Sequence, residues 1–442
     1  DSLEGLIVSI SNYVTVFMAA LYTYWNFRGF GADENRRERF LRKQNGMMFL
    51  IHFLSFSIMF LKTGDERLIP FYGAQAAFLW CFLVLYGKCY RNRWGLLASN
   101  MCFLLSVGFV ILTRLSYDKA VRQFGIVVCS VVAVWPAPFV IRRVWQLSRI
   151  PWLYGALGLG LLGAVYVAGD ASYGAQLSLR LGEVAVQPSE FVKITFVFFV
   201  SAMFYRSTDK KQIVVTSAAA ALHVVILVLS KDLGGGLIFF VTYVFMVFVA
   251  TSDWIYLVLG FLGGSGASAA AWKLFSHVQT RVMAWRDPWA DIDNRGYQIA
   301  QSLFAIGTGG WFGSGLYQGM PGKIPVVEKD FVLAAVSEEM GALFAMCVLL
   351  VCLGCFIQFM MIASRMEAMF YKLIALGLGT EYITQVFLTA GGVTKFIPST
   401  GVTLPLISYG GSSVLSALLM FSVVQGLYML KRDEEEEYEA GF

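Results

Sequence analysis

Long apolar blocks alternate with short charged segments along almost the whole chain. Within each block the apolar residues are contiguous and do not alternate with polar ones, which predicts helices and not membrane β-strands. A helix of about 20 apolar residues crosses the roughly 30 Å of hydrocarbon in a bilayer. The blocks therefore predict about thirteen spans, near residues 5–26, 46–62, 69–87, 95–114, 124–141, 151–169, 190–205, 212–230, 234–251, 254–271, 331–362, 368–390 and 404–430.

The composition narrows the class of protein further. Of the 442 residues, 57% are hydrophobic and 14% are charged, and a soluble domain of this length cannot hide so many apolar residues from water. The seven cysteines lie in or beside apolar blocks and the three histidines are isolated, so neither a disulfide framework nor a histidine metal site is predicted. We expect an all-α polytopic membrane protein without a nucleic-acid partner, because the cations form short clusters between spans.

The positive-inside rule gives the predicted spans a direction. Clusters of Arg and Lys follow the first, third, fifth, seventh and last spans, so all of them fall on the cytoplasmic side if the spans alternate. The segments 170–190, 272–330 and 391–403 and the turn at 231–234 then face outward. The acidic tail, 432–442, is interpreted as a solubilising cytoplasmic end.

Three ionisable residues stand at predicted membrane depth or beside it, where each needs a partner or a water-filled cavity. Glu190 and Lys193 are one helical turn apart at the start of a span and can pair, which leaves a structural role and a substrate-binding role both open. Asp232 lies in an Asp-Leu-Gly-Gly-Gly turn between two spans, where it can cap the next helix or bind substrate.

Three further carboxylates belong to the eleventh and twelfth blocks. Glu338 and Glu339 are expected to lie at the beginning of the eleventh span, where a helix N-terminus stabilises anionic side chains. Glu381 lies within the twelfth span and is expected to face the interior of the helix bundle.

The segment 272–330 concentrates charged and aromatic residues inside an otherwise apolar sequence. Its arginines can keep neighbouring carboxylates ionised or hold a lipid phosphate, and its aromatic rings suit the headgroup layer. Near-helical spacing at 297, 300 and 304 predicts a short helix along the membrane interface, and the glycines at 307–315 predict a close-packed turn, since no strand precedes them. The residues concerned are Asp287, Asp291, Asp293, Arg281, Arg286, Arg295, Trp285, Trp289, Tyr297 and Trp311.

Five stretches of sequence together resemble one family. They are Gln-Pro-Ser-Glu-Phe-Val-Lys at 187–193, Asp-Leu-Gly at 232–234, Gly-Tyr-Gln-Ile-Ala-Gln-Ser at 296–302, Asp-Phe with Ser-Glu-Glu-Met-Gly at 330–341, and Pro-Ser-Thr-Gly-Val-Thr-Leu-Pro-Leu-Ile-Ser-Tyr-Gly-Gly-Ser-Ser at 398–413. The chain resembles the SEDS proteins (RodA, FtsW and SpoVE), the bacterial peptidoglycan glycan polymerases. The resemblance implies a ten-span polymerase core at 95–431 and leaves 1–94 as an N-terminal extension of three predicted spans.

The resemblance also implies an activity. An inverting glycosyltransferase in the bacterial plasma membrane would polymerise lipid II, with Asp291 as general base and undecaprenyl pyrophosphate as leaving group, stabilised by cations or by Mg²⁺ or Mn²⁺. A class B penicillin-binding protein would crosslink the product, and the small-residue stretch 263–271 could dock a partner helix. The expected substrate-binding residues are Arg281, Gln298, Ser302, Lys395, Ser408, Glu190, Lys193, Asp232, Glu338 and Glu339.

The chain departs from the family pattern at several positions. Ile292 follows Asp291 where proline is common, Asp293 offers a rival carboxylate, Glu328-Lys329 replace a frequent His-Thr, and 174–178 lacks a frequent Arg-Trp. One alternative function is a lipid II flippase that uses charged residues within the spans and performs no glycosyl transfer. Another is a non-catalytic scaffold. The polar groups concentrated in the outward segment 272–330 favour the enzyme.

Overall fold

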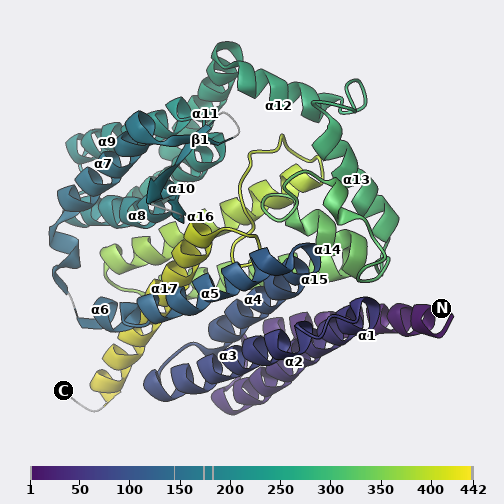
Figure 1. The fold of residues 1–442 in the computed structure, drawn as a ribbon. Coiled ribbons are helices and arrows are strands. Elements are labelled where there is room, and N and C mark those ends of the chain that lie inside the picture. Colours follow the sequence, from purple (N-terminus) through teal and green to yellow (C-terminus); the bar gives the residue numbers. More distant parts are fainter. Residues whose placement is uncertain (1, 144, 173–174, 182–183, 440–442) are drawn as a thin grey trace. The chain divides into compact units, whose positions relative to one another are not determined.

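The structure is a computed structural model that describes residues 2–143, 145–172, 175–181 and 184–439 (Figure 1). The chain divides into two compact units. The first comprises the residues up to Val132 together with Thr280–Gln358 and Val386–Gly410, and the second comprises Ala133–Gln279, Phe359–Gln385 and the residues from Gly411 onward. Each unit therefore joins segments that are far apart in the sequence.

The first unit is built around α4. Every residue of α4 from Leu96 to Thr113 is buried. Gly108 on α4 lies against the 401–410 segment, because an added Cβ there would be 2.9 Å from the carbonyl oxygen of Ile407. The helices of this unit are α1 (Ser2–Arg28), α2 (Glu34–Thr63), α3 (Leu68–Cys89), α4 (Gly95–Leu115), most of α5 (Tyr117–Val134), most of α12 (Ser276–Arg286), α13 (Tyr297–Gly309), η2 (Pro321–Lys323), α14 (Val332–Met340) and most of α15 (Ala342–Arg365).

The second unit is built around α8, which is buried along most of its length, whereas α11 has no buried residue. Its elements are α6 (Ala137–Arg143), η1 (Trp145–Arg149), α7 (Pro151–Ala168), β1 (Asp170–Ser172), β2 (Ala175–Leu181), β3 (Val184–Val186), α8 (Pro188–Arg206), α9 (Lys210–Leu229), α10 (Leu233–Thr251), α11 (Ile255–Leu274), most of α16 (Met369–Val393) and α17 (Gly411–Glu439).

The helical membrane class predicted from the sequence is confirmed. Twelve helices in the described part of the chain are long and apolar enough to cross a bilayer by length and composition, with α5 and α6 joined as one span. They correspond to the second to thirteenth predicted blocks, and the first block corresponds to α1. The short helix predicted from the spacing at 297, 300 and 304 is α13.

The eleventh predicted block is longer than one span requires, which leaves open a tilted helix or a beginning as a helix outside the bilayer. As a single span its predicted extent is wrong. The block at 331–362 forms two helices, α14 and α15, which are separated at Gly341. Gly341 has a φ of 100°, and an added Cβ would be 2.5 Å from the backbone of Phe312. Consequently Glu338 and Glu339 do not begin a span: they lie in the last turn of α14, at the end where the helix dipole does not favour carboxylates.

The segment 170–190, which is predicted to face outward, forms strands that the sequence analysis did not predict. β2 pairs antiparallel with β1 and with β3, so the sheet order is β1-β2-β3. The alternation of apolar and polar residues at 175–181 is typical of a strand and was the available signal. Residue 174, part of the departure from the family pattern, lies outside the described residues.

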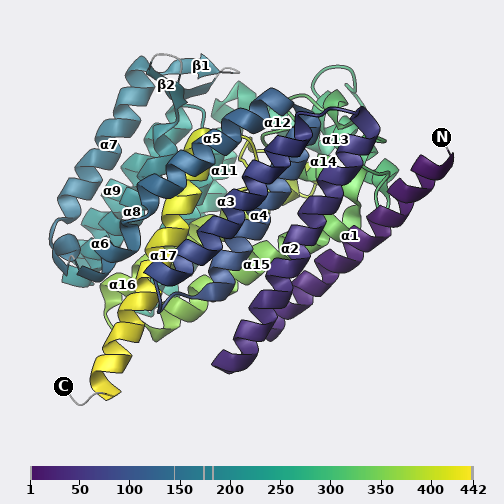
Figure 2. The ribbon, with the colours of Figure 1, turned by 60° about the horizontal axis from the view of Figure 1, so that its bottom comes forward.

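The N-terminal extension packs on the rest of the first unit through buried polar groups. Tyr22 donates to Asn100 at 2.9 Å, Asn100 donates to Asn26 at 2.8 Å, and Trp94 donates to Gln358 at 2.7 Å. Figure 2 shows α2 alongside α1, and α2 also packs on α3 and α4. Because these partners are buried, the extension is an integral part of this unit.

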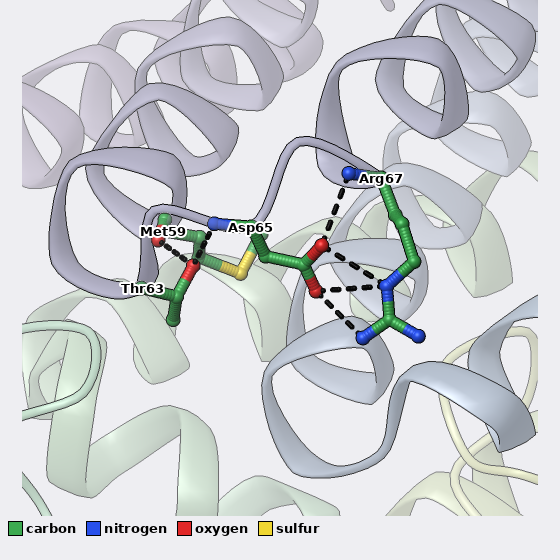
Figure 3. Close-up of polar contacts among 4 residues, drawn as sticks. All are labelled: Met59, Thr63, Asp65 and Arg67. Carbon is green, nitrogen blue, oxygen red and sulfur yellow. Dashed lines mark hydrogen bonds and ion pairs between the residues drawn. The ribbon is translucent and has the colours of Figure 1, made fainter.

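The turn between α2 and α3 is fixed by local hydrogen bonds. Gly64 ends α2 in the left-handed region with a φ of 64°. Figure 3 shows Arg67 donating to both carboxylate oxygens of Asp65, at 2.8 to 3.2 Å, while Thr63 donates to the carbonyl of Met59. This closed turn holds the two apolar helices antiparallel.

Candidate functional site

The loop between α12 and α13 presents Asp291 on a tightly folded backbone. Gly296 lies so close to Pro288 that an added Cβ would be 1.9 Å from the Pro288 carbonyl oxygen. The amide of Gly296 donates to the carbonyl of Asp291 at 2.9 Å, and the side-chain amide of Asn294 donates to the Asp291 carboxylate at 2.9 Å. The Asp291 side chain is 42% exposed, with Arg295 at 3.7 Å. The carboxylate is therefore both fixed and accessible to water.

The rival aspartates have different surroundings. Asp287 accepts from the amide of Trp289 at 3.1 Å, so its carboxylate closes the turn that begins the loop. Trp289 in turn packs on Phe304 of α13, with ring centroids 5.6 Å apart. Asp293 is exposed. Of the three, Asp291 alone combines partial burial with a hydrogen bond from a loop side chain among the contacts described.

The structure brings Arg281 and Lys395 onto adjoining segments although they are far apart in the sequence. Arg281 on α12 donates to the carbonyl of Ser399 at 3.0 Å, and Trp285, one turn later, donates to the carbonyl of Lys395 at 3.1 Å. Lys395 itself has a φ of 60°, in the left-handed region. These bonds tie α12, which directly precedes the loop that carries Asp291, to the segment 391–403 that carries Lys395.

Asp330 is a carboxyl group near Arg281 that the predicted site did not include. Burial raises the pKa of Asp330 to about 6, while the nearby charges of Arg281 and Lys329 oppose that rise. The signal that could have found it was its place in the Asp-Phe pair of the family resemblance. A half-buried carboxyl that titrates near neutrality beside a cation is typical of functional sites.

Three predicted substrate-binding residues of this unit have polar groups bound to the protein itself. Gln298 donates to the carbonyl of Pro325 at 2.9 Å, and the buried Ser302 donates to the carbonyl of Val393 at 2.8 Å. Ser408 accepts from the amide of Leu404 at 2.9 Å and donates to the carbonyl of Lys329. These bonds hold the segments 321–330 and 391–410 around the site, and substrate contact by these residues remains a prediction.

Glu338 and Glu339 are buried and held by specific partners. Arg114 of α4 reaches Glu339 with a shortest N–O distance of 2.7 Å, and its guanidinium lies 4.1 Å from the ring centroid of Tyr317. Glu338 accepts from the amide of Met320 at 2.8 Å. An arginine, and not a helix N-terminus, therefore compensates the Glu339 charge.

A second polar cluster lies in the second unit. The predicted pair is confirmed, since Lys193 lies 2.7 Å from Glu190 and also donates to Gln385 at 2.8 Å. The predicted cap is confirmed as well, since Asp232 accepts from the amide of Gly235 at 2.8 Å. Glu381 is fully buried, as expected, and Lys193 and Glu190 are its charged neighbours. Glu190, Lys193 and Glu381 therefore form one charged cluster among the helices.

The described side chains do not form an evident metal-binding site. Among the residues that the structure describes, no group of three or more His, Cys, Asp or Glu side chains is close enough to hold an ion. The glycine-rich stretch at 307–315 is a close-packed turn, as predicted: added Cβ atoms at Gly309 and Gly313 would lie 2.2 and 2.4 Å from carbonyl oxygens of residues 337 and 339.

These features define a polytopic α-helical membrane protein with a fixed, water-accessible carboxylate in one unit and a buried charged cluster in the other. A family model described as a cell cycle protein, which covers FtsW, RodA and SpoVE, matches residues 93–433. The chain belongs to this family.

Two relatives and two solved structures illustrate the similarity. Peptidoglycan glycosyltransferase RodA of Mycobacterium tuberculosis is 35% identical over 298 residues, which are 63% of this chain. The match spans 64% of the length of that relative. Probable peptidoglycan glycosyltransferase FtsW of Aliivibrio salmonicida is 30% identical over 77% of this chain and 87% of the relative. The fold matches one chain of a peptidoglycan synthase complex that coordinates polymerization and crosslinking (TM-score 0.66, 24% identity, 76% of this chain and 97% of that chain). It also matches Thermus thermophilus RodA (TM-score 0.57, 24% identity, 76% and 96%).

Proposed function

We propose that this chain is a peptidoglycan glycosyltransferase that polymerises lipid II, with Asp291 as general base. The observation that carries the proposal is the fixed and accessible carboxylate of Asp291, next to the segments that carry Arg281 and Lys395. The names of the relatives, which are peptidoglycan glycosyltransferases, support the same reaction.

The reaction is a single displacement at the anomeric carbon of the donor sugar. A hydroxyl of the acceptor sugar forms the new C–O bond while its proton passes to Asp291, and the bond from the anomeric carbon to the lipid pyrophosphate breaks. One displacement inverts the linkage from α to β and needs no covalent intermediate with the enzyme. Asp291 suits this role because its loop is held by Gly296 and Asn294 while its oxygens stay open to solvent.

The pyrophosphate leaves as an anion and needs positive charge at the place where that charge develops. Arg281 and Lys395 are the cations that we assign to this role. Arg281 donates to the carbonyl of Ser399, which fixes its guanidinium beside the segment that carries Lys395. Since the described residues offer no ready-made metal ligand set, we assign no step to a divalent ion.

We also propose that the loop carrying Asp291 faces outward from the bacterial plasma membrane and that a crosslinking transpeptidase of class B acts with this chain. The clusters of Arg and Lys that fall on one side of the predicted spans support this orientation. The fold match to a complex that couples polymerization and crosslinking supports such a partner. In α11, residues 263–271 are small and unburied, which suits close packing of a partner helix.

The test is polymerisation of labelled lipid II by the purified chain with its partner. Asp291→Asn should lower the rate by about 10²- to 10⁴-fold, the usual contribution of a general base. Asp293→Asn makes the same change two residues away at an exposed position and should keep the rate of the unchanged protein. If Asp291→Asn polymerises normally, Asp291 is not the base. If the unchanged chain makes no polymer but moves lipid II across vesicles, it is a flippase.

A further inference from the structure

A cavity of about 650 Å³ opens in the second unit, where three elements that are distant in sequence come together. Ser148 and Arg149 of η1 and Tyr205 and Arg206 at the end of α8 line it, together with residues at the beginning of α16. Its volume lies within the range of small-ligand sites in proteins. The lining combines two guanidinium groups with aromatic and hydroxyl side chains.

The charges around this cavity favour an anion. Arg206 donates to the carbonyl of Arg149 at 2.8 Å, which fixes η1 against the end of α8 and leaves further N–H donors on its guanidinium. The acidic residues beside the beginning of α16 are already compensated, because Glu367 and Glu434 lie 2.7 and 3.6 Å from Lys431. The lining itself contains two arginines and no acidic residue.

The beginning of α16 adds backbone donors. The helical hydrogen-bond ladder starts with the amide of Lys372, which donates to the carbonyl of Ala368 at 3.0 Å. The amides of Phe370 and Tyr371 precede it and have no carbonyl partner within the helix. Amides at a helix N-terminus, at the positive end of the dipole, bind phosphate groups readily. Two arginines, hydroxyl groups and helix amides together make a site for phosphate.

The surface next to the cavity is apolar and exposed. Ile150, Trp152 and Leu153 directly follow Arg149 and are 41, 52 and 60% exposed. Trp152 and Leu153 belong to the first turn of α7, which is one of the candidate membrane spans. A ligand with a phosphate at one end and acyl chains at the other would cover both surfaces, whereas a soluble phosphate compound would cover only the cavity.

We propose that this cavity binds the headgroup of an anionic phospholipid of the cytoplasmic leaflet. Arg149 and Arg206 provide the charge contacts, and the acyl chains lie along the start of α7. The positive-inside rule places both arginines on the cytoplasmic side, where anionic lipids hold basic residues near the membrane surface. The site is independent of the glycosyl transfer proposed above, because it requires none of the residues assigned to that reaction.

The test is lipid binding to the purified full chain by native mass spectrometry, with phosphatidylglycerol as the anionic probe and phosphatidylcholine as the zwitterionic one. Replacing both Arg149→Gln and Arg206→Gln should weaken phosphatidylglycerol binding roughly tenfold to thirtyfold, given the usual contribution of basic residues at an anionic membrane surface. The matched control replaces the exposed Arg39→Gln and Arg42→Gln on α2, which removes the same charge from the same predicted side and should leave the tightest site intact.

A second variant keeps the test decisive if the double replacement does not fold. Ala368 is an exposed residue that lines the cavity, so Ala368→Trp should block the site without a change in charge. Equal losses in the cavity variants and the α2 control would show general charge attraction and overturn the proposal, as would unchanged binding in Ala368→Trp. If glycerol 3-phosphate saturates the site and lipid does not displace it, the ligand is a soluble phosphate compound and the lipid assignment is wrong.

Discussion

The sharpest test of the site geometry is the addition of a single methyl group at Gly296. The φ of Gly296 is −83°, so alanine fits its backbone conformation and only the space matters. The new Cβ would lie 1.9 Å from the Pro288 carbonyl oxygen, where ordinary contact is 3.4–4 Å. Backbone atoms must therefore separate by more than about 1 Å, which moves the loop that presents Asp291.

The effects of Gly296→Ala on stability and on activity can be measured separately. Overpacking of this kind costs about 1–3 kcal/mol of stability. A displacement of about 1 Å in a catalytic group can lower a rate by about 100-fold. We therefore expect Gly296→Ala to lose polymerisation activity far beyond its loss of folded protein, with every chemical group of the site retained. Initial rates of lipid II polymerisation and thermal unfolding in the same detergent measure the two effects.

Gly307→Ala is the matched control, because it adds the same methyl group within α13, the helix that Gly296 caps, at a place where nothing lies within 4 Å of the new atom. It should keep the activity and gain up to about 1 kcal/mol of stability, as alanine does in place of glycine within helices. Normal polymerisation by folded Gly296→Ala would refute the argument that a fixed Asp291 loop is required.

Three further predictions concern single buried groups. Burial raises the Asp330 pKa to about 6, so the protonated form favours folding and its contribution to stability is present below about pH 4 and lost as the pH rises through 6. Asp330→Asn should remove this dependence of the unfolding temperature on pH. An unchanged pH dependence in the variant contradicts the assignment. Arg114→Met should lower the free energy of unfolding by about 3–5 kcal/mol, because Glu339 is then buried and unpaired. Adding Glu339→Leu to this variant should recover much of the loss. If chemical denaturation finds no difference between the single and the double variant, the pair does not stabilise the fold. Lys193→Met should lower the unfolding temperature for the same reason, and adding Glu190→Gln should raise it again.

How much of the site the sequence predicts depends on whether its contacts are local. The Glu190–Lys193 pair and the Asp232 cap involve residues three apart, so helix periodicity alone predicts them, and both are confirmed. The bonds from α12 to the segment 391–403 join residues more than 100 positions apart. No local rule connects such residues, and only the family resemblance had placed Arg281 and Lys395 in one site.

Two features of the structure differ from the sequence prediction, for different reasons. The apolar run at 331–362 satisfies the length rule for one long span, but close packing of Gly341 against Phe312 breaks it into two helices. That break moves Glu338 and Glu339 from the expected beginning of a span to the end of a short helix, where Arg114 from α4 compensates Glu339. The strands β1 to β3 were missed because a segment between predicted spans was interpreted as a loop despite the alternating pattern at 175–181.

Hydrophobic blocks therefore suffice to establish the helical membrane class and to single out the polar segment that carries Asp291, because the bilayer imposes its length on every span. Tertiary packing decides that α12 meets the segment 391–403 and that Glu339 pairs with Arg114. Those choices depend on contacts of about 3 Å between segments that are distant in the sequence, and such contacts leave no periodic signal in a single chain.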